Sequence, residues 1–150
     1  MRTVKQILAY AVIVICLLSL IACEREITGS EADYVLSISD PMMENLMLGF
    51  ESNDYAVFSS DFDPFMQASI PADDFPDFKQ DVDSQLGNYL SREVQRVAQS
   101  DEYYVVDYRV KFEQAEPVTV GFAFHINQPQ TINHLWVNTD QQSWAPEPPR

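Results

Sequence analysis

The chain has 150 residues, a formal net charge of −14 and two cysteines. A chain of this length forms one domain and buries a core without needing disulfides or metals. Its acidity argues against a nucleic-acid partner, because an anionic surface repels phosphate backbones.

The first 22 residues have the layout of a secretory signal peptide. Arg2 and Lys5 form a basic start, and an almost uninterrupted apolar run follows from residue 7 to residue 22. The run is short for a membrane-spanning helix, which needs about 20 apolar residues. Removal of the signal takes away Cys16 and leaves Cys23 as the single cysteine. The net charge then falls from −14 to −16, since two cations and no acid are lost.

Leu20-Ile21-Ala22-Cys23 resembles a bacterial or archaeal lipoprotein lipobox. The resemblance implies diacylglyceryl attachment to Cys23, with palmitate-type acyl chains, and cleavage just before it. We therefore expect an exported domain that is anchored to the cell membrane or the outer membrane and lies outside the cytoplasm. The alternative is an uncleaved signal anchor with Cys23 at the membrane edge, which also tethers an exported domain.

A single domain is expected between two polar segments. Residues 23–33 predict a short tether, and residues 139–150, with three prolines, predict a disordered tail. In the first half of the domain, helix N-caps are expected at Asp40-Pro41, Asp54, Asp63-Pro64 and Asp74. Apolar residues follow each of them at helical spacing, and Gly87 is placed to end the last helix.

The second half of the domain predicts strands. Residues 103–113, 118–126 and 131–138 carry apolar residues with a strand-like period of two, and residues 89–98 do so imperfectly, which suggests a bulge. Helices followed by about four antiparallel strands indicate an α+β domain over residues 34–138.

Several segments resemble a prokaryotic domain family of unknown function, common in lipoproteins, within the nuclear transport factor 2-like superfamily. They are Asp54-Tyr55, Phe58-Ser59, Asp61-Phe62, Leu86-Gly87-Asn88-Tyr89, Tyr104–Glu113 and Val118-Thr119-Val120. The resemblance implies a cone, in which a curved sheet wraps around helices and encloses a cavity. The segment Asn133-His134-Leu135-Trp136 departs from it, since a glycine is expected just before the Leu-Trp pair. The fold hosts enzymes, transport factors and binding modules, so it does not define a chemistry.

Aromatic residues of the predicted strands are candidates for an apolar ligand cavity: Tyr104, Tyr108, Phe122, Phe124 and Trp136. The alternative is that they form the domain core. Four cations, Arg92, Arg96, Arg109 and Lys111, fall on two predicted strands. They could form a patch for an acidic partner or a homodimer through the sheet, or pair with acidic residues across the strands.

No catalytic, cofactor or metal constellation is predicted. His125 and His134 are the only histidines, and no acidic or histidine neighbours stand at metal-ligand spacing. We therefore expect a non-catalytic domain that binds a small apolar ligand or a protein partner. Two alternatives stay open: a small isomerase, dehydratase or hydrolase that uses the cone cavity, and a structural envelope protein that acts through its sheet face.

Overall fold

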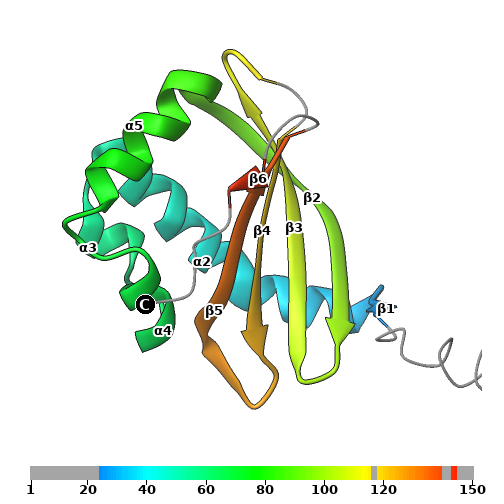
Figure 1. Cartoon of the computed structure of the whole chain (residues 1–150). Coiled ribbons are helices and arrows are strands. Elements are labelled where there is room, and N and C mark those ends of the chain that lie inside the picture. The colour runs from blue at the N-terminus through cyan, green and yellow to red at the C-terminus, as the bar shows by residue number, and fades with distance from the viewer. Residues whose placement is uncertain (1–23, 116–117, 140–142, 145–150) are drawn as a thin grey trace, which may run out of the picture.

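The computed structural model describes residues 24–115, 118–139 and 143–144, and they form an α+β domain (Figure 1). A short strand comes first, then the helices and then five more strands, and the six strands form one antiparallel sheet in the order β1-β2-β3-β4-β5-β6. The elements are β1 (Arg25–Glu26), α2 (Ser30–Ser52), α3 (Tyr55–Phe58), α4 (Pro64–Ser69), α5 (Phe75–Leu86), β2 (Tyr89–Ser100), β3 (Tyr103–Phe112), β4 (Val118–His125), β5 (Gln128–Asn138) and β6 (Ser143–Trp144).

The sheet is curved and the helices lie on one side of it, with α2 running behind the strands and α3 to α5 gathered at one end (Figure 1). We call the side facing the helices the inner face; it carries Val106, Tyr108 and Phe122, which are at most 1% exposed. The outer face carries Asp107, Gly121 and Trp136, which are neighbours across β3, β4 and β5. This arrangement is the α+β architecture that the alternating strands and the helix spacing predicted. It is consistent with the cone that the family resemblance implies.

The predicted caps of α3 and α4 are confirmed. Asp74 precedes α5 without a side-chain cap hydrogen bond, and Asp40 and Pro41 lie inside α2 instead of starting a helix. Asp54 accepts hydrogen bonds from the backbone N–H groups of Ala56 and Val57, and Asp63 accepts one from Met66 N at 2.7 Å. These carboxylates satisfy N–H groups that have no partner within their helices. Gly49 is required where α2 touches α3, because a Cβ there would overlap the backbone of Phe58.

Two β-bulges change which face some residues occupy. In β2, Val94 pairs with Tyr108 but Arg96 pairs with Asp107, so one extra residue separates them. In β5, Ile132 pairs with Phe124 but His134 pairs with Ala123, so Asn133 is extra. Each bulge reverses the alternation of side chains along the rest of its strand.

The expected tether over residues 23–33 is wrong for its described part. Arg25 and Glu26 pair with β2, Ile27 is only 3% exposed, and α2 already begins at Ser30. The folded domain therefore begins at β1 and not at residue 34. Within the expected tail, residues 143–144 form β6 against β5. Cys23, the signal segment and the remaining tail residues lie outside the described residues.

Candidate functional site

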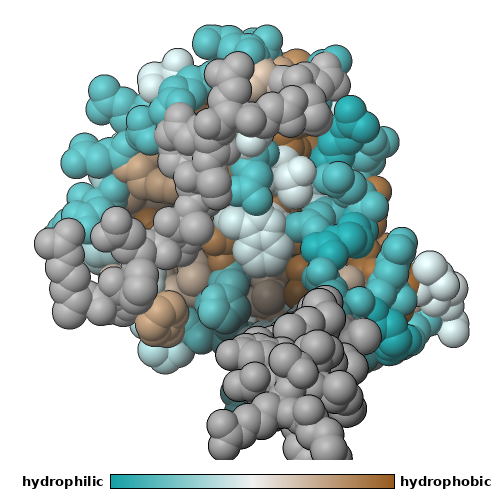
Figure 2. Space-filling view, turned by 45° about the vertical axis from the view of Figure 1, so that its right-hand side comes forward, coloured by the Kyte–Doolittle hydropathy of each residue, from teal (hydrophilic) through white to brown (hydrophobic). Residues whose placement is uncertain are grey.

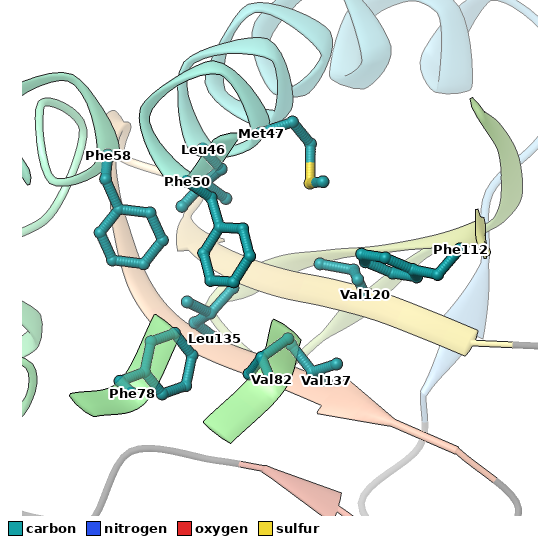
Figure 3. A pocket seen from close by; sticks show the side chains of 10 residues that line it. All are labelled: Leu46, Met47, Phe50, Phe58, Phe78, Val82, Phe112, Val120, Leu135 and Val137. Atoms are coloured by element: carbon teal, nitrogen blue, oxygen red, sulfur yellow. The ribbon is translucent and has the colours of Figure 1, made fainter. Parts of the chain in front are cut away.

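A small cavity lies between the helices and the inner face of the sheet (Figure 3). Its volume is about 40 Å³. Ten residues line it: Leu46, Met47 and Phe50 from α2, Phe58 from α3, Phe78 and Val82 from α5, and Phe112, Val120, Leu135 and Val137 from the sheet. The helical stripes that the sequence predicted as core thus supply most of the wall opposite the strands.

The chemistry of the cavity is that of an apolar site. All ten described lining residues have hydrocarbon or thioether side chains. A cavity lined in this way stays dry, and one of about 150 Å³ is large enough for benzene. At about 40 Å³, this cavity accommodates an apolar group of a few atoms as it stands.

Aromatic rings close the cavity on the side of α5. Phe78 lies edge-on to Phe50 with ring centroids 6.2 Å apart, and it lies at the same distance from Phe58. Phe75 contacts Phe58 with centroids 4.6 Å apart. The Nζ atom of Lys79 lies 4.7 Å from the centre of the Phe50 ring. Helix α5 therefore covers the cavity through ring contacts.

Four of the five predicted cavity residues come together on the inner face, but they are not among the described residues that line the cavity. Tyr104 lies 5.7 Å from Phe124, and Tyr108 stacks on Phe122 with centroids 6.0 Å apart. These rings are part of the packed core. The cavity itself lies nearer to α5, where Phe112 ends β3.

The hydroxyl of Tyr108 reaches a polar group of α2 inside the core. Its oxygen lies 2.8 Å from Ser39 Oγ and 2.9 Å from Asp40 Oδ1. Burial raises the pKa of Tyr108, and its hydrogen bond to Ser39 acts in the opposite direction. Because both partners come from the protein, this phenol fixes α2 against β3.

Trp136, the fifth predicted cavity residue, lies on the outer face, so its assignment to the cavity is corrected. Successive side chains of β5 alternate between the two faces of the sheet, so Trp136 points away from the face that carries Leu135 and Val137. Its Nε1 donates a hydrogen bond of 3.0 Å to Asp107 Oδ1.

Asp107 is the centre of this outer network. It is only 7% exposed although it is charged. Nε and Nη2 of Arg96 both lie 2.8 Å from its Oδ2 atom, so each carboxylate oxygen has a partner. The absence of a side chain at Gly121 provides the space for this contact, because a Cβ there would lie closer than 3 Å to Asp107 and to the Trp136 indole. Sequence reasoning missed this network, because the imperfect alternation of residues 89–98 indicated a bulge but not its position, and nothing indicated the bulge in β5.

The four predicted patch cations do not form one surface. Arg92 pairs with Glu44 of α2 at 2.8 Å, whereas Arg96 pairs with Asp107 and, at 2.7 Å, with Glu24. The cross-strand pairing that the sequence left open is therefore observed for Arg96. Hydrogen bonding to Glu24, and then to Asp107, raises the pKa of this guanidinium.

Arg109 and Lys111 are exposed on the outer face of β3. The two histidines also lie on the sheet's outer face, on either side of Tyr103, with ring centroids 5.4 Å and 5.5 Å from it. His125 Nε2 lies 3.3 Å from Glu102 Oε2. Among the residues that the structure describes, no group of three or more histidine, cysteine or acidic side chains could hold a metal ion.

The fold and the cavity define a small α+β domain in which helices close an apolar space against a curved sheet. The chain belongs to DUF3887, a family of proteins of unknown function, which matches residues 44–135. No curated protein and no solved structure matches the chain. In the described part of the chain, no helix has the length and apolar character that crossing a membrane requires.

Proposed function

We propose that the protein is a membrane-anchored extracytoplasmic lipoprotein whose domain binds a small apolar ligand. The observation that carries the binding function is the cavity, whose ten described lining residues are all apolar and come from α2, α3, α5 and three strands. The helices wrapped by a curved sheet also support a place in the nuclear transport factor 2-like superfamily, whose cone encloses a cavity.

Sequence features support the anchor. A basic start, an apolar run and the lipobox-like Leu20-Ile21-Ala22-Cys23 precede the domain directly. Strand β1 begins at Arg25 and pairs with β2, so lipid attached to Cys23 would hold the domain at the membrane without a long tether.

Binding fits the cavity better than acid–base catalysis does. A general acid or base needs a titratable group within hydrogen-bonding distance of the reacting atoms, and the described lining supplies carbon and sulfur atoms. The two buried polar groups near the sheet, Tyr108 and Asp107, are bound to other protein groups. Asp107 also lies on the opposite face of the sheet.

Ligand entry into the cavity is tested with xenon, a single apolar atom, as the probe and methyl NMR as the measurement. Adding xenon is expected to shift the methyl resonances of Met47, Leu46 and Val82, which line the cavity. Val137→Leu adds a methylene group inside the cavity and is expected to reduce these shifts. Val94→Leu makes the same change at a residue that is 42% exposed, and it should leave them unchanged. Equal shifts in both variants would contradict binding at this site.

The anchor is tested separately by metabolic labelling of the full chain with palmitate. Label is expected on the wild-type protein and not on Cys23→Ser. Label that persists in Cys23→Ser would overturn attachment at this residue and leave the cavity experiment unaffected.

A further inference from the structure

The charge of the domain is divided unevenly between its helices and its sheet. Residues 30–86, which hold the helices, contain thirteen acidic residues and one lysine, a net charge of −12. Residues 87–139, which hold the four long strands, contain six acidic residues and four cations, a net charge of −2. Near an anionic surface, such a domain is repelled at its helical side and much less at its sheet.

The chain enters the domain on the sheet side. Glu24 Oε2 lies 2.7 Å from Nη1 of Arg96, which belongs to the outer-face network. The next residues, Arg25 and Glu26, pair with the edge of β2. Cys23 precedes Glu24 by one peptide bond, and consecutive Cα atoms are about 3.8 Å apart. A lipid on Cys23 would therefore start within one residue of the Glu24–Arg96 ion pair on the outer face.

The outer face also has side chains that suit a lipid headgroup layer. Trp136 and Tyr103 are half-buried, with an apolar body and a polar tip, and such residues are enriched where membrane meets water. Arg109 and Lys111 are exposed on the same face. A cation close to an anionic leaflet contributes about 1 kcal/mol.

We propose that the outer face of the sheet lies against anionic phospholipid headgroups of the bilayer that holds the anchor, with the helices projecting away. This inference rests on the proposed attachment at Cys23. It gives the anchored domain a fixed orientation, in which the cavity under α5 is on the side away from the membrane. Its ligand would then arrive from the aqueous phase or from a partner and not from the supporting bilayer.

Tryptophan quenching tests the orientation in the full-length lipidated protein. The protein is placed in vesicles of brominated phosphatidylcholine with phosphatidylglycerol. The chain has two tryptophans, so Trp144→Phe leaves Trp136 as the reporter. Its fluorescence is expected to be quenched by the brominated chains and shielded from aqueous acrylamide.

A matched reporter on the helical side is Leu48→Trp combined with Trp136→Phe and Trp144→Phe, since Leu48 is 51% exposed on α2. This reporter is expected to escape the brominated lipid and to respond to acrylamide. Equal quenching of the two reporters, or quenching of the helical one alone, would overturn the orientation.

Charge provides the second arm of the experiment. Arg109→Gln with Lys111→Gln is expected to lower the ratio of docked to undocked domain about fivefold for each cation, provided that phosphatidylglycerol is present. An unchanged ratio would contradict docking by headgroup charge. Shielding of Trp136 that grows with protein density and needs no anionic lipid would assign the face to a second copy of the chain instead.

Failure of the anchor and failure of the orientation give different results. Protein that does not float with the vesicles lacks the attachment, which overturns both proposals. Protein that floats with its vesicles while Trp136 stays unquenched retains the anchor and refutes the orientation alone.

Discussion

Gly121→Ala is the substitution that tests the outer network most sharply. Gly121 lies in β4 between Asp107 of β3 and Trp136 of β5. An added Cβ would come closer than 3 Å to the Asp107 carboxylate and the indole. The ring and the carboxylate must therefore move apart, and the hydrogen bond of 3.0 Å between them is broken or lengthened.

Two effects set the magnitude for Gly121→Ala. Overpacking of a filled site costs about 1–3 kcal/mol, and a hydrogen bond to a charged group contributes about 1.5–3 kcal/mol. The same displacement causes both losses, so we expect a total of about 2–4 kcal/mol. Domains have about 5–15 kcal/mol of stability, so the variant should still fold.

Urea unfolding in a Trp144→Phe background provides the assay for Gly121→Ala, with Trp136 emission as one signal and circular dichroism as the other. Trp136→Phe removes the indole N–H donor and replaces the ring by a smaller one. Gly121→Ala should therefore lower the free energy of unfolding less in the Trp136→Phe protein than in the protein that retains Trp136. A double-mutant cycle measures this difference. A cost for Gly121→Ala below about 0.5 kcal/mol, the size of an ordinary surface substitution, would refute the described packing.

Further substitutions test the other polar groups. Burial raises the pKa of Tyr108, so the unfolded chain releases this proton near pH 10 while the native state retains it. Stability should therefore fall as pH rises above about 10, and urea unfolding of Tyr108→Phe should show a shallower alkaline decline. Asp63→Ala removes the α4 cap and a partner of Asn133, and thermal unfolding should show a loss of about 2 kcal/mol. Arg96→Gln leaves a nearly buried carboxylate without its charge partner and should cost about 2 kcal/mol in urea unfolding. Glu24→Gln, a change at an exposed residue, should cost under about 0.5 kcal/mol. Three results would contradict these explanations. They are an alkaline decline in stability that Tyr108→Phe leaves unaltered, an Asp63→Ala variant as stable as the wild type, and equal losses of stability in Arg96→Gln and Glu24→Gln.

Local chemistry made much of the fold predictable. Asp54 and Asp63 were identified as helix caps because an aspartate before a helix accepts backbone hydrogen bonds whatever the tertiary context. The strands β3 and β4 were predicted because one face is buried along their whole length, which imposes a period of two.

In β2 and β5, the strand period of two does not predict which face of the sheet each side chain occupies. Trp136 was grouped with the aromatic residues of the predicted cavity, but it lies on the outer face, because the extra residue Asn133 reverses the alternation that would otherwise place it with Ile132. The side chain of Asn133 holds that bulge, since it accepts from His125 N at 2.9 Å and donates to Asp63 Oδ2 at 2.7 Å. His125 is eight residues away across the β4–β5 turn and Asp63 is seventy residues away, so the strand period of two does not indicate either contact.

The same reasoning explains the cations and the N-terminal segment. Arg92 and Arg96 were placed in one candidate patch because both fall on the same predicted strand. The bulge between them puts their side chains on opposite faces of the sheet. The polar segment that begins at Glu24 was predicted to be a tether because its composition shows neither the pairing with β2 nor the ion pair with Arg96. Both interactions depend on strands more than seventy residues away.

The most direct test of the proposed anchored lipoprotein is the intact mass of the full-length protein extracted from the membranes of an expressing cell. The account predicts a chain that begins at Cys23 and carries a diacylglyceryl group on its sulfur. A chain that retains residues 1–22, or one that begins at Cys23 without lipid, would contradict it.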